Sequence, residues 1–257
     1  MFPIAHVWLL EQVIADPLPA HYLGCVWPDM LFGSPLSHAE SHQRGTQLLA
    51  YARQRQVDGT HHADEFAAFV TGVLTHGSEP HGFDWYSDEA YGDQPLSARG
   101  YAFQRGGSLA EATAAACRLA PSYGPWKAHN IVEMAFEVPL RLADLRLGER
   151  FVAANGDRAL IDRIATPLAD CFGYPADELA SAMRTFGQWW SVPDSNTSLA
   201  HLYALQLRAK HGVTDVDEPA LAALIERATT LIAPDRDTYL ATAVNGVARM
   251  LDELGAW

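Results

Sequence analysis

Residues 63–76 read ADEFAAFVTGVLTH, and their apolar side chains recur at the spacing of an amphipathic helix. The same helical period runs through most of the chain, whereas the apolar–polar alternation typical of strands is nearly absent. Helices are predicted over residues 3–15, 37–56, 63–76, 108–119, 125–147, 157–171, 176–190, 197–211, 218–232 and 237–254. Because no repeat, linker or break in composition divides the chain, we expect one all-α domain over residues 1–257, with about nine or ten helices.

The composition is that of a globular protein. Of the 257 residues, 49% are hydrophobic and 19% are charged, which excludes intrinsic disorder and allows a sizeable core. The formal net charge is −13, from 18 Lys and Arg against 31 Asp and Glu. This charge argues against a dedicated nucleic-acid binder, which needs surplus cations to neutralise phosphates. No apolar stretch approaches the roughly 18 residues of a membrane span, so none is predicted.

The cysteines indicate a reducing compartment. Cys25, Cys117 and Cys171 are far apart in the sequence, and an odd number without a close pair does not suggest a disulfide framework. The N-terminal apolar run contains His6 and Glu11 and lacks a preceding basic region, so it is a poor signal peptide. We therefore expect a cytoplasmic protein, and the sequence assigns no oligomeric state.

Several catalytic signatures are missing from the sequence. It contains no G-x-G-x-x-G, P-loop, G-x-S-x-G or H-E-x-x-H motif, so nothing in it supports a serine or cysteine nucleophile. Histidine is the informative residue, because eight of the 11 histidines fall within the first 81 residues.

The tightest histidine motif is PWKAHNIVEMAFE, residues 125–137, in which His129 and Glu133 are four residues apart. On a helix this spacing places an imidazole and a carboxylate on one face, within reach of a single metal ion. A surface hydrogen bond is the simpler interpretation of such a pair. The apolar residues around it indicate that part of the helix is buried, and a buried carboxylate needs a partner.

Three further segments contain candidate ligands. Asp29 ends the apolar run HYLGCVWPDM at residues 21–30, where a helix-capping role is the alternative. His38 and His42 are four residues apart in SPLSHAESHQRG at residues 34–45. His76 ends the helix predicted over 63–76, where an interaction with the helix dipole would equally account for it.

The order of these segments, after an N-terminal apolar helix that contains His6, resembles the zinc-dependent phospholipase C family. That family has an all-helical fold, which it shares with the zinc-dependent single-strand nucleases. The resemblance covers roughly residues 1–137. Residues 150–257 match nothing by motif.

The resemblance implies a set of zinc ligands: His6, Asp29, His42, His76, His129 and Glu133. It also makes Asp29 the candidate general base, and His38 is the alternative to His42. The family's aspartate one turn after "GVLTH" is displaced, because residue 80 is Pro. Asp84 is preferred as the displaced carboxylate, because the flanking Phe83 and Trp85 are expected to anchor the loop that follows residue 76. Glu79 and His81 are the alternatives.

The implied cofactor is two or three Zn²⁺ ions, because imidazoles and carboxylates suit zinc. Zinc would activate a water molecule for attack on a phosphoric ester, in a phospholipid or a small phosphodiester or monoester. A single-strand nuclease and a metal-stabilised helical protein without catalysis are the alternative functions. Aromatic residues around the loop either line a substrate pocket or pack the loop: Phe83, Trp85, Tyr86, Tyr91 and Trp126.

Overall fold

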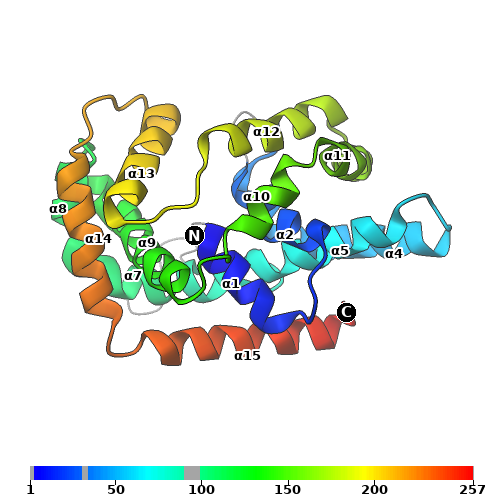
Figure 1. The fold of residues 1–257 in the computed structure, drawn as a ribbon, viewed down its shortest axis with the longest axis horizontal. Helices are drawn as coiled ribbons and strands as arrows, with labels where there is room; N and C mark the ends of the chain where they lie inside the picture. The colour runs from blue at the N-terminus through cyan, green and yellow to red at the C-terminus, as the bar shows by residue number, and fades with distance from the viewer. Residues whose placement is uncertain (1–2, 31–33, 90–98, 257) are drawn as a thin grey trace. The chain divides into compact units, whose positions relative to one another are not determined.

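The computed structural model describes residues 3–30, 34–89 and 99–256, and none of these residues is in a β-strand. They form helices that Figure 1 labels in chain order. The helices are α1 (Pro3–Val13), α2 (Pro19–Val26), α3 (His38–Gln43), α4 (Gly45–Val57), α5 (Ala63–His76), α6 (Phe83–Asp88), α7 (Tyr101–Gly106), α8 (Ala110–Ala116), α9 (Gly124–Ala143), α10 (Glu149–Gly156), α11 (Arg158–Phe172), α12 (Ala176–Trp189), α13 (Asn196–His211), α14 (Glu218–Ile232) and α15 (Arg236–Leu254), with 3-10 helices η1 (Trp27–Asp29), η3 (Gly107–Leu109) and η4 (Pro121–Tyr123). The predicted all-α class is confirmed.

The long helices begin and end close to their predicted bounds. Helices α5 and α14 match the predicted segments 63–76 and 218–232, and the ends of α11, α12, α13 and α15 lie within one residue of their predicted bounds. Their ends have recognisable causes. Asp157 caps α11 by accepting a hydrogen bond from the Leu160 amide, and Gly173 ends α11 in the left-handed conformation that favours glycine.

The predicted number of helices was wrong, because short helices lie where loops were expected. The segment 37–56 divides at Arg44 into α3 and α4, and α6 lies inside the predicted loop 77–100. Helices of six to eight residues contain too few apolar positions to show a period. The helix predicted over residues 108–119 is also shorter in the structure, where α8 is Ala110–Ala116 and has no side-chain cap.

Contacts within the chain group it into two compact units. Unit 1 comprises Met1–Ala5, Tyr86–Leu145 and Pro193–Ala241. Unit 2 comprises His6–Trp85, Arg146–Val192 and Thr242–Trp257. The single-domain organisation over residues 1–257 therefore stays a prediction, and each unit is described by itself.

Unit 2 is built around α5, which packs against α2, α4 and α11. The crossing of α2 and α5 is close because each helix has a glycine there. A Cβ on Gly72 would lie 2.3 Å from the His21 carbonyl oxygen, and one on Gly24 would lie 2.0 Å from that of Phe69. This crossing brings the end of α2, which leads to Asp29, against the helix that ends at His76.

We expect Gly72→Ala to lower the free energy of unfolding by about 3 kcal/mol, because both backbones at the crossing would have to move apart. Gly156→Ala is the matched control, because a Cβ at Gly156 has no atom within 4 Å. It should leave stability unchanged or raise it by about 0.5 kcal/mol. Urea unfolding of both variants measures the difference, and equal stabilities would contradict the tight crossing.

Unit 1 is built around α9, which packs against α7, α8 and α14. The stripe Ile131, Val132, Met134, Ala135 and Phe136 is buried, as the apolar period of this segment predicts. The same helix also contains four buried polar residues, Lys127, His129, Glu133 and Glu137. Burial of charged groups is costly, so these residues mark α9 as the helix that contributes to a site.

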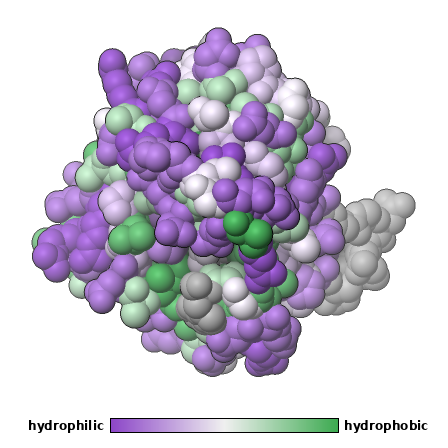
Figure 2. Space-filling model, turned by 90° about the vertical axis from the view of Figure 1, so that its right-hand side faces the viewer, coloured by the Kyte–Doolittle hydropathy of each residue, from purple (hydrophilic) through white to green (hydrophobic). Residues whose placement is uncertain are grey.

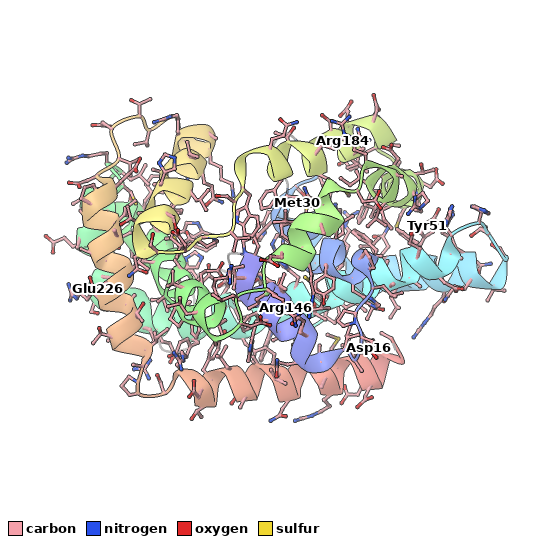
Figure 3. All side chains as sticks on the ribbon, in the orientation of Figure 1. Asp16, Met30, Tyr51, Arg146, Arg184 and Glu226 are labelled. Carbon is pink, nitrogen blue, oxygen red and sulfur yellow. The ribbon has the colours of Figure 1, made fainter. Side chains whose placement is uncertain are left out.

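The exposed surface agrees with the acidic composition. Hydrophilic residues cover most of the face in Figure 2, and the side chains drawn in Figure 3 include many carboxylates on the helix exteriors. Met30, labelled in Figure 3, is by contrast buried directly after η1.

Among the described residues, no helix is long and apolar enough to cross a membrane. All three cysteines are free thiols.

Candidate functional site

Five of the predicted ligands meet in unit 2, and we call His6, Asp29, His42, His76 and Asp84 the three-histidine cluster. The Nε2 atoms of His42 and His76 lie 3.4 and 3.2 Å from Oδ2 of Asp84. The Nε2 atom of His6 lies 3.5 Å from the other oxygen, Oδ1. Asp84 therefore presents one oxygen to each side, as a carboxylate that bridges two cations would.

Asp29 lies on the open side of this cluster. Its carboxylate oxygens are 3.9 Å from His42 Nε2 and 4.0 Å from His76 Nε2. Its side chain is 28% exposed, whereas those of the other four members are at most 5% exposed. Asp29 is thus the member of the cluster that solvent and a substrate can reach.

The backbone after α5 positions two of the histidines. The amides of Ser78 and Glu79 both donate hydrogen bonds to the carbonyl oxygen of His42, at 2.9 and 3.1 Å. A Cβ at Gly77 would lie 2.6 Å from that same oxygen, so only glycine allows this approach. The end of α5, with His76, is thereby held directly against α3, with His42.

Hydrogen bonds leave the ring nitrogens available as metal ligands. The Nδ1 atom of His76 lies 2.7 Å from the Cys25 carbonyl oxygen, so it donates there and leaves Nε2 as the donor of a lone pair. His42 uses Nδ1 in the same way, at 3.0 Å from the His38 carbonyl oxygen. The His76 Nε2 atom and both ring nitrogens of His6 are buried without a hydrogen-bond partner among the described residues.

The pKa values follow from this burial. Burial lowers the pKa of His6 and of His42 well below 6.5, which keeps both imidazoles neutral. Burial also lowers the pKa of His76, but the Asp84 carboxylate outweighs it and raises that pKa. For Asp84, burial alone would raise the pKa, yet the His76 imidazole holds it well below its usual value. The cluster therefore combines an ionised carboxylate with two neutral imidazoles, His6 and His42, the protonation states that metal ligands need.

A second group lies in unit 1, and we call Asp88, His129 and Glu133 the His129 cluster. One ligand atom from each of the three residues lies within 4.8 Å of the others. His129 Nε2 is 3.9 Å from Asp88 Oδ2. Glu133 is fully buried, and burial lowers the pKa of His129 to about 4. The four-residue spacing of His129 and Glu133 thus places them together, as predicted.

Neighbouring polar side chains orient Glu133. Ser87 donates a hydrogen bond of 2.7 Å to one of its oxygens, and Asn130 donates one of 3.4 Å to the other. Tyr203 in turn donates to the Asn130 amide oxygen at 3.2 Å. Such outer partners fix a ligating carboxylate in one orientation.

Sequence reasoning missed Asp88. Asp84 and Asp88 are four residues apart in DWYSD, the spacing of one helical turn. That spacing could have indicated Asp88, but the segment was interpreted as a loop, in which spacing has no such meaning. The actual helix α6 contributes one aspartate to each cluster.

The alternative candidates lie outside both clusters. Glu79 and His81 are exposed, and the His81 ring stacks on Trp85 with centroids 4.1 Å apart. His38 is also exposed and stacks on His42 instead of facing Asp84. The geometry therefore favours Asp84 and His42 over these alternatives.

The predicted substrate contacts need a correction. Phe83 is 0% exposed and lies edge-on to the His6 ring at 5.6 Å, so it supports the cluster and cannot touch a substrate. Tyr91 lies outside the described residues. Trp126 is 46% exposed and lies edge-on to the His129 ring at 4.8 Å.

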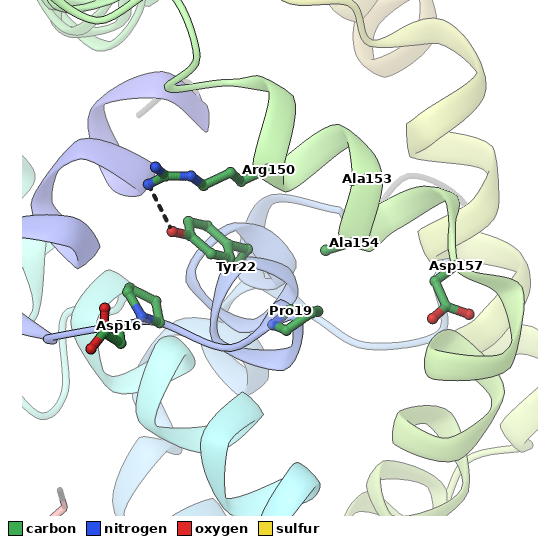
Figure 4. Close-up of a pocket in the computed structure, with 8 residues that line it drawn as sticks. Asp16, Pro19, Tyr22, Arg150, Ala153, Ala154 and Asp157 are labelled. Atoms are coloured by element: carbon green, nitrogen blue, oxygen red, sulfur yellow. Dashed lines mark hydrogen bonds between the residues drawn. The ribbon is translucent and has the colours of Figure 1, made fainter.

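A separate pocket of about 510 Å³ in unit 2 includes no member of either cluster. Figure 4 shows that Arg150 points toward Tyr22 in this pocket, and the dashed line marks their hydrogen bond of 3.3 Å. Arg150 also binds Glu11 at 2.6 Å, so its charge is already compensated.

Comparison with known proteins adds no relative. No protein-family model, curated protein or solved structure matches the chain. The two clusters are therefore the observations on which a function can be based.

Proposed function

We propose that this chain is a zinc-dependent hydrolase of phosphoric esters, with the fold of the zinc-dependent phospholipase C family. The observation that carries the proposal is the set of buried imidazole nitrogens around Asp84 that have no hydrogen-bond partner among the described residues. A buried polar atom without a partner costs free energy, and a bound cation would remove that cost.

The donor atoms fit zinc. Neutral imidazole and carboxylate are its usual non-sulfur ligands, and both are present in each cluster. In this proposal His42, His76, Asp29 and Asp84 would hold one ion, and His6 would contribute to a second beside Asp84. The His129 cluster holds a further ion, so two or three ions are expected.

Different residues of the chain have different roles in the proposed reaction. A bound zinc supplies a water molecule whose pKa falls to about 7 and polarises a phosphoryl oxygen. Asp29 is the carboxylate on the open side of its cluster and accepts the proton of the attacking water. Ser87 and Asn130 keep Glu133 oriented in the His129 cluster.

A small or lipid phosphoester suits this surface better than a polynucleotide does. The net charge of −13 repels long polyanions such as nucleic acids. Counterion release strengthens the binding of a polyanion only where cationic side chains neutralise its phosphates. A substrate with a single phosphate needs only the metal ions. We therefore expect faster hydrolysis of such esters than of single-stranded DNA.

Metal analysis of the purified protein, together with a panel of chromogenic phosphodiesters and monoesters, tests the proposal. We expect bound zinc and phosphoester hydrolysis in the wild type. His76→Ala and His129→Ala should each lose zinc, and both should lower the melting temperature, because metal binding to the native state stabilises it. His201→Ala is the matched control, since His201 is exposed and its ring bonds only Glu218 among the described residues.

Each other outcome rejects part of the proposal. Protein without bound zinc would reject the metal site. Zinc without turnover on any phosphoester would leave a metal-stabilised helical protein. Cleavage of single-stranded DNA that exceeds ester hydrolysis and falls steeply with salt would identify a nuclease.

A further inference from the structure

Glu137 is a buried carboxylate on α9 that the proposed chemistry does not use. It is 0% exposed and lies one helical turn beyond Glu133. It belongs to neither cluster of candidate ligands. A buried carboxylate costs free energy unless hydrogen bonds compensate it, so its partners should explain its presence.

Its partners are the first backbone amides of α1. Ile4 N–H donates to Oε2 at 3.0 Å, and Ala5 N–H donates to Oε1 at 2.8 Å. These amides belong to the first turn of the helix, where N–H groups have no intrahelical acceptor, and Pro3 has no N–H at all. Both Ile4 and Ala5 are 0% exposed, so water cannot replace the carboxylate.

Both interactions are favourable. The positive end of the helix dipole attracts a carboxylate, and two N–H donors on two oxygens make a bidentate contact that fixes the start of α1 along and around its axis. Burial raises the pKa of Glu137 to about 8, against the lowering effect of the two amide hydrogen bonds. The two amide hydrogen bonds therefore offset the cost of burial only in part, and they are the contacts that favour the ionised form.

His6 follows Ala5 directly in α1. A metal-binding histidine is normally oriented by a hydrogen bond to its second ring nitrogen. His6 differs, because neither of its ring nitrogens has a hydrogen-bond partner among the described residues. Its ring is placed by stacking on His76 at 3.6 Å, by the edge of Phe83 and by the backbone of α1.

We propose that Glu137 is a positioning residue that places His6 in the three-histidine cluster by fixing the start of α1. By holding the backbone of Ile4 and Ala5, Glu137 orients the His6 side chain, which has no hydrogen bond of its own among the described residues to orient it. The consequence for metal binding rests on the proposed function, whereas the placement of the His6 ring does not. The zinc affinity and the placement of the His6 ring can be measured separately.

The first measurement is the zinc affinity of Glu137→Gln. The glutamine side chain keeps one oxygen acceptor, but its NH₂ group would face the N–H of Ile4 or Ala5, and two donors repel each other. The start of α1 should therefore shift. We expect zinc binding to weaken about 10–100-fold, the usual effect of losing an outer partner of a ligand. Glu137→Asp, which is too short to reach both amides, should give a smaller loss, and it also serves if Glu137→Gln does not fold.

Two controls separate positioning from general stability. Asp157→Asn removes a comparable cap, from Leu160 on α11, and should lower the melting temperature without weakening zinc binding. In a His6→Ala background, Glu137→Gln should add no further loss of affinity. An equal loss in both backgrounds, or an equal loss in Asp157→Asn, would overturn the proposal.

The second measurement uses metal-free protein and imidazole NMR. The His6 signals should be shifted by the ring current of His76, and Glu137→Gln should change that shift while the His201 signals stay in place. Unchanged His6 signals would overturn the positioning role even if the protein binds zinc. If the wild type binds no zinc but the His6 signals move, the proposed function fails and the positioning role stands.

Discussion

Asp29→Asn is expected to reduce turnover of phosphoesters by about 10²–10⁴-fold, the usual contribution of a general base. Asparagine has nearly the same shape and can still offer an oxygen to a cation, but it cannot accept a proton from water. The Michaelis constant should therefore change far less than kcat does. This separation is expected because Asp29 is the exposed carboxylate of a cluster whose other members are buried.

Steady-state kinetics together with zinc analysis measure this effect. Asp177→Asn is the matched control, because Asp177 is an exposed aspartate at the start of α12, outside both clusters. It should retain wild-type turnover. If Asp29→Asn keeps its zinc and also keeps wild-type kcat, Asp29 is not the base.

The sequence predicts the long helices because their apolar periods extend over several turns. In α5 the period continues to His76, so both the helix and its terminal histidine could be located. His129 and Glu133 could be paired for the same reason, since four residues make one turn. The structure brings these residues and the other predicted ligands into two groups, as their order along the chain suggested.

The features that the sequence did not predict depend on contacts that no local sequence pattern shows. Helix α6 has six residues, so the spacing of Asp84 and Asp88 was hidden in an apparent loop. For Phe83 the sequence left two roles open, lining a substrate pocket or packing the loop, and in the structure the side chain is buried and packs on His6. The bond from Ala5 to Glu137 joins residues 132 positions apart, a distance at which sequence spacing indicates nothing.

In metal-free protein, the contribution of His129 to the free energy of unfolding is expected to fall as the pH drops below about 6.5. The pKa of His129 is lowered from 6.5 to about 4 by burial, so between these values the unfolded chain takes up a proton that the folded protein does not. By linkage, the stabilising contribution of neutral His129 is complete above the unfolded pKa and is lost as the pH falls toward the folded one. At about pH 5 the loss from His129 alone should reach about 2 kcal/mol.

The other imidazoles modify this slope without reversing it. The pKa values of His6 and His42 are also lowered by burial, so they add to the loss in acid. The pKa of His76 is raised through Asp84, so its contribution is present at low pH and is lost as the pH rises through its folded pKa. Three histidines therefore oppose one among these imidazoles. Burial also raises the pKa of Glu137 to about 8, so the contribution of Glu137 is larger at low pH and opposes that of His129. The His129 contribution is therefore measured as the difference in slope between the wild type and His129→Gln.

Urea unfolding of chelator-treated protein at about pH 7.5 and about pH 5 measures the slope. His129→Gln should be less stable at neutral pH, because it loses the ring that stacks on Phe103 at 4.4 Å, but its stability should depend less on pH. His201→Gln should keep the wild-type slope, since His201 is exposed. An identical slope in His129→Gln and in the wild type would show that His129 is not held neutral, because a group whose pKa is the same in both states adds nothing to the pH dependence of unfolding.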